Sequence, residues 1–239
     1  MNVEKGRLYL IPTTLGDNEP LEVLPLSVKK CIEELDWFIV ENEKTARRFI
    51  KRITPKKKQQ ALNILLLDKY ADQMEVLTYL DECDKGVSVG LLSEAGVPAI
   101  ADPGAEIVKM AHEKQVRVVP LVGPSSIIMA MMSSGFNGQN FAFNGYLPID
   151  PAERKKKIKF LERQSFDQNQ SQIFIETPYR NEKMFNDLKS TLAPNTKLCI
   201  ACDITLQTEY IKSMKIKDWK QQSPDLHKRP AIFIIQKEV

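Results

Sequence analysis

Residues 93–104, SEAGVPAIADPG, form the segment whose composition best suits ligand binding. Its glycine and alanine residues would let main-chain N–H and C=O groups approach a ligand closely. Pro98 and Pro103 would stiffen the segment, and its length is unusual for a purely structural turn. It has neither the G-K-[ST] ending of a phosphate-binding loop nor a G-x-G-x-x-G pattern. We therefore expect a rigid loop that binds a flat or polar small molecule.

Few side chains in the sequence suit metal or acid–base chemistry. The only histidines are His112 and His227, which argues against a histidine metal site and a Ser-His-Asp triad. Cys199 and Cys202 form a C-x-x-C pattern inside a strand-like run, where side chains three apart point to opposite faces. We interpret them as core residues and predict no metal site. Glu41 is the best-placed general base, although a solvated carboxylate or a helix-cap partner is its more ordinary role.

The first half of the chain alternates short apolar runs with helical patterns. Strands are expected at 8–12, 38–41, 63–67, 87–92 and 116–120, and helices at 26–35, from 45 to 50, at 72–82 and at 104–114. This order predicts a parallel sheet covered by helices, with right-handed crossovers. Such sheets bind ligands beyond the carboxyl ends of their strands, and residues 93–104 directly follow the fourth strand.

After Pro120 the pattern changes at a joint rich in Gly and Pro, LVGPSS. Strands then follow one another more closely, at FAFNGYL, SQIFIE, KLCIACDI, EYIKSM and PAIFII. A basic helix is expected from about residue 151 and another over 179–192. The fold class is therefore α/β with two domains: residues 1–120 around a parallel sheet, and residues 121–239 around a mixed one.

The composition is that of a soluble globular protein, with 239 residues of which 43% are hydrophobic and 27% charged. The start, MNVEKGRLYL, has no apolar stretch behind a basic cap, and no run suits a membrane span, so we expect a cytoplasmic protein. A net charge of +3 permits a nucleic-acid partner without arguing for one. Two basic clusters, at 51–58 and 154–159, favour RNA somewhat, although such runs are usually solvated faces.

Seven segments resemble, in order, motifs of the ribosomal RNA ribose methyltransferases in the tetrapyrrole methylase superfamily. SEAGVPAIADPG resembles S-D-A-G-T-P-G-I-S-D-P-G, and LYLIPTTLGD resembles L-Y-[IV]-V-A-T-P-I-G-N. The other five are VENEKTARRFI, VGPSS, FNGYLP, IETPYR and ACDITLQTE, which resemble A-E-D-T-R-x-T-R-x-L-L, P-G-P-S-A, F-L-G-F-L-P, Y-E-S-P-H-R and A-R-E-L-T-K-x-x-E. The match extends over essentially the whole chain.

This resemblance implies a tetrapyrrole methylase-like fold, a homodimer, and S-adenosylmethionine bound in a cleft between the two α/β domains. Carried over position by position, it implies cofactor contacts at Pro12, Ser93, Glu94, Ala95, Gly96, Pro98, Ile100, Ser125, Ser126, Gly145, Tyr146, Glu176, Thr177, Ile204, Thr205, Pro230 and Ala231.

The departures from the family pattern fall on segments that face the substrate in the family. E-D-T-R is replaced by Glu41-Asn42-Glu43-Lys44, and the arginine and lysine of A-R-E-L-T-K are replaced by Cys202 and Leu206. We expect methylation of a ribose 2'-hydroxyl in small-subunit ribosomal RNA. Two alternatives stay open: methylation of a small molecule such as a tetrapyrrole, and a diverged, non-catalytic paralogue that only binds the cofactor.

Overall fold

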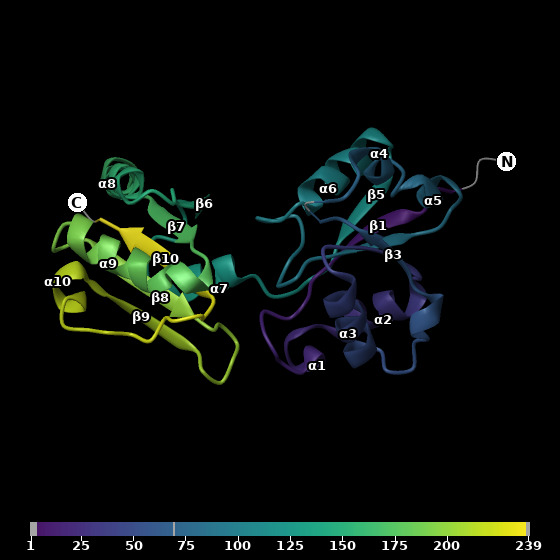
Figure 1. Cartoon of the computed structure of the whole chain (residues 1–239), viewed down its shortest axis with the longest axis horizontal. Coiled ribbons are helices and arrows are strands. Elements are labelled where there is room, and N and C mark those ends of the chain that lie inside the picture. Colours follow the sequence, from purple (N-terminus) through teal and green to yellow (C-terminus); the bar gives the residue numbers. More distant parts are fainter. Residues whose placement is uncertain (1–3, 69, 238–239) are drawn as a thin grey trace. The chain divides into compact units, whose positions relative to one another are not determined.

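The computed structural model describes residues 4–68 and 70–237. The chain divides into two compact units, Met1–Ser125 and Ser126–Val239 (Figure 1). The boundary predicted after residue 120 lies a few residues earlier than this division. Residues 121–124 stay with the first unit because Leu121 N–H donates to the Leu10 carbonyl (3.0 Å) and Gly123 packs directly against Pro12.

The first unit has a five-stranded sheet in the order β3-β2-β4-β1-β5, and all of its strand pairs are parallel. Its strands are β1 (Arg7–Ile11), β2 (Trp37–Val40), β3 (Asn63–Leu66), β4 (Val89–Leu92) and β5 (Arg117–Pro120). The central strand β4 is buried at every position, because helices cover both faces of a parallel sheet. The helices are α1 (Pro20–Val23), α2 (Leu26–Glu34), α3 (Glu43–Ile53), η1 (Gln59–Ala61), α4 (Gln73–Val76), α5 (Asp81–Asp84) and α6 (Gly104–Glu113).

Helix α3 begins where the sequence departs from the family motif. The Asn42 side chain caps the helix by accepting hydrogen bonds from Lys44 N–H (3.0 Å) and Thr45 N–H (3.2 Å). Glu43 places a negative charge in the first turn, which the helix dipole favours. The altered segment is therefore a well-formed helix start, and it fixes the direction in which the rest of α3 leaves the sheet.

The single helix predicted over residues 72–82 is wrong. Helix α4 starts there, with Asp72 accepting from Met74 N–H (2.9 Å), but a turn separates it from α5. The turn buries Tyr79 and Leu80 together, and the Tyr79 hydroxyl donates to the Leu66 carbonyl. Tertiary packing against β3 thus overrides the helical spacing of the apolar residues.

The second unit has a mixed sheet in the order β6-β7-β10-β8-β9, in which only the β6–β7 pair is parallel among the described strands. Its strands are β6 (Phe141–Tyr146), β7 (Ser171–Ile175), β8 (Lys197–Cys202), β9 (Tyr210–Lys215) and β10 (Ala231–Gln236). Its helices are α7 (Ser126–Ser134), α8 (Pro151–Gln168), η2 (Pro178–Arg180), α9 (Asn181–Thr191) and α10 (Ile216–Trp219). No helix in the described part of the chain is long and apolar enough to cross a membrane.

The core of the second unit is aromatic and aliphatic. The rings of Phe174 and Phe233 stack at 5.9 Å, and Phe185 meets Trp219 edge-on at 5.5 Å. Cys199 and Cys202 are buried free thiols within β8, in agreement with the core interpretation. Burial raises the pKa of the Cys202 thiol to about 11, which keeps it protonated and unreactive at neutral pH.

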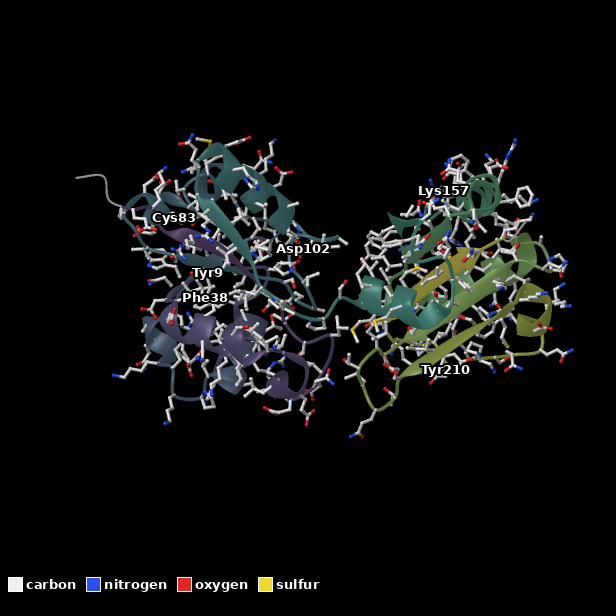
Figure 2. All side chains as sticks on the ribbon, turned by 180° about the vertical axis from the view of Figure 1, so that it is seen from behind. Tyr9, Phe38, Cys83, Asp102, Lys157 and Tyr210 are labelled. Atoms are coloured by element: carbon white, nitrogen blue, oxygen red, sulfur yellow. The ribbon has the colours of Figure 1, made fainter. Side chains whose placement is uncertain are left out.

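One residue of the predicted basic cluster at 154–159 is structural. Arg154 is buried, and its guanidinium donates to Asp187 Oδ2 through Nε (2.8 Å) and Nη2 (2.6 Å) and to the Ile149 carbonyl (2.7 Å). It therefore joins α8 to α9. Lys155, Lys156 and Lys159 are exposed, whereas Lys157, labelled in Figure 2, is half-buried with its ammonium 4.8 Å from the centre of the Phe160 ring.

We predict that Arg154→Ala destabilises the second unit by about 3–5 kcal/mol, because the Asp187 carboxylate loses both guanidinium donors and keeps only the Lys155 ammonium, 3.7 Å away, as a partner. Urea unfolding in a Trp37→Phe background, where Trp219 is the remaining tryptophan, reports on this unit. Lys156→Ala, at a side chain 75% exposed, is the control and should change stability by less than about 0.5 kcal/mol. If the two substitutions changed the free energy of unfolding equally, the structural role of the buried Arg154 side chain would be contradicted.

Candidate functional site

The carboxyl edge of the first sheet gathers the site residues predicted for this unit. Neighbouring strands β2, β4 and β1 run parallel, so the residues that follow them lie at one edge. Pro12 follows β1, Glu41 follows β2, and residues 93–100 follow β4. Ser125 ends the segment that follows β5. Residues far apart in the sequence are therefore brought to one place by the sheet alone.

A hydrogen-bonded turn shapes the start of the loop 93–104. The Gly96 carbonyl accepts from Thr13 N–H (2.9 Å) and from the Ser93 hydroxyl (2.9 Å). The Thr13 hydroxyl in turn donates to the Ser93 carbonyl (3.2 Å). The first loop and the central loop are thereby held together, and Ser93 and Gly96 are buried in the process.

Three residues of this loop adopt left-handed backbone conformations. Gly96 has φ +76°, Ala99 has φ +66° and Ala101 has φ +61°. The alanines pay a steric penalty of roughly 1–2 kcal/mol each in this region. The Asp102 carboxylate holds the strained segment by accepting from Ala99 N–H (2.9 Å) and Gly104 N–H (2.8 Å). Such retained strain is a mark of functional loops.

The loop separates its structural residues from those that can meet a ligand. Ser93, Gly96 and Pro98 are buried and serve the turn itself. Ala95 and Ile100 are exposed, together with Glu94. The surface available to a ligand is therefore the small apex around Ala95, flanked by one carboxylate and one apolar side chain.

Three carboxylates surround the end of β2. Glu94 N–H donates to Glu41 Oε1 (3.4 Å), and the Thr45 hydroxyl donates to Glu94 Oε1 (2.6 Å). The pKa of Glu41 is raised, first by burial and then by the negative charge of Asp102. Glu94 has two opposite effects on this pKa: its N–H group, which donates to Glu41, lowers it, and its negative charge raises it. Burial likewise raises the pKa of Asp102, labelled in Figure 2, against the N–H groups that it accepts. Glu41 is thus a carboxylate held in an unfavourable environment, as a general base often is.

The second unit also brings its predicted residues to one edge of its sheet. Strand β10 is antiparallel to β7 and β8, so its first residue lies beside their last residues. Asp203 N–H donates to the Pro230 carbonyl (3.0 Å) across this edge. Ser126 opens α7, and the remaining predicted residues lie at the ends of β6, β7 and β8 and at the start of β10: Gly145, Tyr146, Glu176, Thr177, Ile204, Thr205, Pro230 and Ala231.

Two of these positions carry unusual backbone geometry. Gly145 lies at a β-bulge with φ +61°, and a Cβ placed there would meet no atom within 4 Å. Thr205 has φ +78°, which is rare for a β-branched residue. Glu176, by contrast, is buried and accepts from Arg180 Nη2 (2.6 Å) and Thr177 N–H (2.7 Å). Its carboxylate orders the start of the segment that follows β7.

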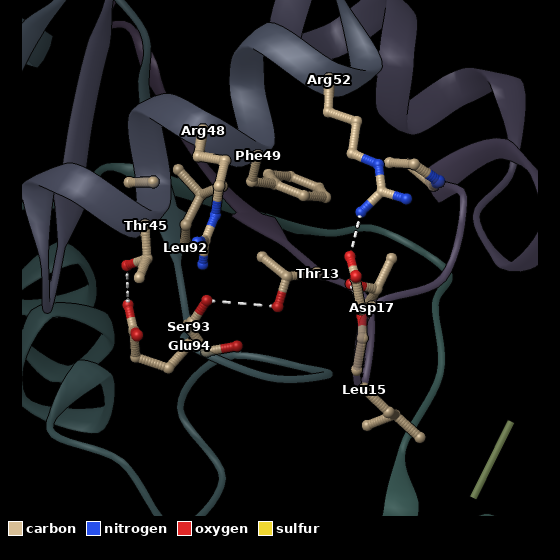
Figure 3. A pocket seen from close by; sticks show the side chains of 14 residues that line it. Thr13, Leu15, Asp17, Thr45, Arg48, Phe49, Arg52, Leu92, Ser93 and Glu94 are labelled. Atoms are coloured by element: carbon tan, nitrogen blue, oxygen red, sulfur yellow. Dashed lines mark hydrogen bonds and ion pairs between the residues drawn. The ribbon is translucent and has the colours of Figure 1, made fainter. Parts of the chain in front are cut away.

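A pocket of about 550 Å³ opens beside the loop 93–104 in the first unit (Figure 3). Arg48 and Phe49, which sequence reasoning missed, line it from α3. The remaining lining residues come from the first loop, from the start of α1, from α3, and from the end of β4 with the loop after it: Thr13, Thr14, Leu15, Gly16, Asp17, Pro20, Thr45, Ala46, Arg52, Leu92, Ser93 and Glu94. The sequence signal that could have identified Arg48 and Phe49 is the segment TARRFI, which closely follows the strand end that carries Glu41.

Two basic residues of the predicted cluster at 51–58 are already paired. Arg52 donates to Asp17 Oδ1 (2.5 Å) and also bridges to Glu19, which closes one wall of the pocket. Lys57 donates to Asp36 Oδ1 (2.9 Å) and to a backbone carbonyl of α2. Two of the five basic residues of this cluster are therefore engaged in ion pairs.

Comparisons with known proteins agree with this architecture. No protein-family model matches the chain. The chain is 26% identical over 231 residues to "Ribosomal RNA small subunit methyltransferase I" of Vibrio cholerae serotype O1, covering 95% of this chain and 76% of that protein. It is 28% identical over 234 residues to the protein of the same name from Buchnera aphidicola subsp. Schizaphis graminum, covering 96% and 78%.

Solved structures share the fold at low sequence identity. The methyltransferase CobJ aligns with a TM-score of 0.64 at 13% identity, covering 97% of this chain and 94% of that one. The cobalt precorrin-4 methyltransferase CbiF aligns with a TM-score of 0.61 at 15% identity, covering 96% and 94%. The uroporphyrin-III-C-methyltransferase of Thermus thermophilus aligns with a TM-score of 0.53 at 15% identity, covering 97% and 92%.

These findings confirm the fold class and the resemblance drawn from the motifs. The chain is a methyltransferase that shares the fold of these solved enzymes. Within that class, it is similar along nearly its whole length to the enzymes named ribosomal RNA small subunit methyltransferase I.

The raised pKa of Glu41 predicts a pH-dependent effect of Glu41→Gln. A carboxyl with a raised folded-state pKa contributes stability that is fully present below its unfolded-state pKa of about 4.3 and is lost as pH rises through the folded-state pKa. The variant should therefore be more stable than the parent protein at pH 7, and the difference should disappear towards pH 4. Hydrogen exchange of the β2 and β4 amides at both pH values measures the stability difference between the variant and the parent protein. Glu22→Gln, at an exposed glutamate of α1, is the control. A difference that grows as pH falls would contradict the assignment.

The tight turn predicts that Gly96→Ala destabilises the first unit by about 1–2 kcal/mol. The residue has φ +76°, and a Cβ there would lie 3.0 Å from the Pro124 carbonyl oxygen and 2.9 Å from Leu15. Gly138→Ala is the matched control, because a Cβ at that position meets no atom within 4 Å. Urea unfolding compares the two, and a harmless Gly96→Ala would mean that the turn tolerates a side chain.

Proposed function

We propose that the protein transfers a methyl group from S-adenosylmethionine to a ribose 2'-hydroxyl of small-subunit ribosomal RNA. The similarity to enzymes named for this RNA, which covers about 95% of the chain, is the observation that carries the proposal. The motifs shared with that family include the loop 93–104, which follows β4, and parallel sheets commonly bind ligands beyond the carboxyl ends of their strands. The proposal also includes a cytoplasmic location and a homodimer.

The loop 93–104 has the features needed to hold the methyl donor. Its apex at Ala95 is exposed and nearly free of side chains, so a ligand can approach the main chain there. The surrounding turn is fixed by the Thr13 and Ser93 hydrogen bonds. Because the loop is already ordered, binding loses less conformational entropy. When bound, S-adenosylmethionine supplies an electrophilic methyl group on a sulfonium. The protein then has to position the acceptor and exclude water.

Glu41 is the proposed general base for the acceptor hydroxyl. Its pKa is raised by burial and by Asp102, so its carboxylate binds a proton more strongly than an exposed glutamate does. In the proposed reaction the hydroxyl proton passes to the Glu41 carboxylate while the hydroxyl oxygen bonds to the methyl carbon, and the methyl–sulfur bond of the sulfonium breaks to leave a neutral thioether. Glu94 N–H, which donates to Glu41 Oε1, keeps this carboxylate beside the loop that holds the donor.

We predict that Ala95→Leu weakens S-adenosylmethionine binding at least about tenfold without changing the melting temperature, because Ala95 is exposed and the longer side chain would occupy the ligand surface. Calorimetry measures the affinity. Ala105→Leu, at an exposed alanine of α6, is the control and should bind as the parent protein does.

The acceptor is tested with tritiated S-adenosylmethionine and small ribosomal subunits from cells that lack the protein. The parent protein should label a single ribose, and Glu41→Gln should lower kcat roughly a hundredfold or more. Label found only in a small-molecule fraction would favour the tetrapyrrole alternative. Tight cofactor binding with no transfer to any extract would favour the non-catalytic paralogue.

A further inference from the structure

The pocket in the first unit is distinct from the surface proposed for the cofactor. Its volume of about 550 Å³ is within the range of roughly 300–1,000 Å³ that small-molecule sites occupy. Of the residues proposed for the cofactor, only Ser93 and Glu94 line it, while Ala95, Gly96 and Ile100 do not. The two surfaces therefore meet at Glu94, which is the arrangement that a donor site and an acceptor site require.

Arg48 is the cation that this pocket leaves available for a ligand. Within residues 4–68 and 70–237, its guanidinium makes no hydrogen bond or ion pair. Arg47, on the same helix, donates to Glu43 Oε1 (2.7 Å), and Arg52 is held by Asp17 and Glu19. Figure 3 shows the Arg48 side chain directed into the pocket, opposite Glu94. Since the planar guanidinium suits the oxygens of a phosphate, an anionic group is the ligand that Arg48 would recognise.

Phe49 gives the same pocket an aromatic wall. It is half-buried and lies between Arg48 and the Arg52 bridge in Figure 3. Aromatic side chains bind unpaired bases by stacking, in a way that tolerates different sequences. The wall near Glu94 is polar, with the hydroxyls of Thr13 and Thr45.

We propose that this pocket takes one unpaired nucleotide of the acceptor RNA, with its phosphate on Arg48 and its base against Phe49. Enzymes that modify a nucleotide remove it from its stack and hold it in a fitted pocket. The proposal deepens the proposed function and rests on it, since an RNA acceptor is assumed. Glu94 and the neighbouring Glu41 would then receive the ribose side of the nucleotide, next to the methyl donor.

The experiment measures methyl transfer to small ribosomal subunits with Arg48→Ala, Phe49→Leu and Lys51→Ala. Lys51 is an exposed cation of α3 outside the pocket, and it controls for the loss of a charge. Arg48→Ala should raise the KM for RNA roughly tenfold and reduce the salt dependence of binding by about one phosphate contact. Phe49→Leu should lower kcat/KM roughly fivefold or more. The affinity for S-adenosylmethionine should stay unchanged in all three variants.

A second measurement does not depend on turnover. A single-stranded RNA carrying 4-thiouridine is irradiated with each protein, and the crosslinked peptide is identified by mass spectrometry. The crosslink should map to residues 45–52 in the parent protein, persist in Lys51→Ala and fall at least fivefold in Phe49→Leu.

The outcomes separate the two proposals. If the parent protein methylates RNA but Arg48→Ala and Lys51→Ala have equal effects, or the crosslink lies elsewhere, the pocket assignment is overturned and the proposed function stands. If the parent protein binds the cofactor but labels no RNA, the proposed function fails. A crosslink at α3 that Phe49→Leu abolishes would then still support a nucleotide pocket, and a crosslink elsewhere would overturn it.

Discussion

The turn in which one carbonyl oxygen, that of Gly96, receives two donors is the constraint on which the candidate site depends. Thr13 N–H arrives from the loop after β1 and the Ser93 hydroxyl from the loop after β4. Two neighbouring strands of a parallel sheet share no hairpin that could align their loops, so side-chain and main-chain hydrogen bonds must do it. Once these loops are joined, Ala95 is exposed to solvent and the Glu94 carboxylate accepts a hydrogen bond from the Thr45 hydroxyl. Ser93 and Glu94 then form part of the pocket wall.

Much of the fold could be predicted from the sequence because it depends on local patterns. Apolar runs such as NILLL and VRVVP became strands within a residue or two of the expected bounds, and the small residues of 93–104 did form the loop after β4. The helix expected over 72–82 failed because burial of Tyr79 is decided by β3, which a helical spacing does not include. Arg154 was counted among the surface charges for the same reason: its partner Asp187 lies on another helix.

The candidate site was less predictable, because residue type does not reveal which charges are free. The basic run at 51–58 reads as a cationic surface, yet Arg52 and Lys57 have acidic partners. Arg48 lies near them in the sequence, yet it forms no ion pair among the described residues. Gly96 likewise fits a binding motif, although its positive φ and the nearby Pro124 carbonyl already require a glycine. The role of Glu41 depends on Asp102, whose proximity follows from the sheet order.

The position of β10 has a consequence for biosynthesis. This strand is the last of the described strands to leave the ribosome, yet it lies in the middle of its sheet, between β7 and β8. Until it emerges, the β6–β7 pair and the β8–β9 hairpin have no main-chain ladder joining them, and Phe174 lacks the ring of Phe233. The first unit can complete its own ladder much earlier, because all of its strands precede residue 121. The nascent chain would therefore fold in two stages, with the second half waiting as two unjoined fragments that a chaperone could recognise.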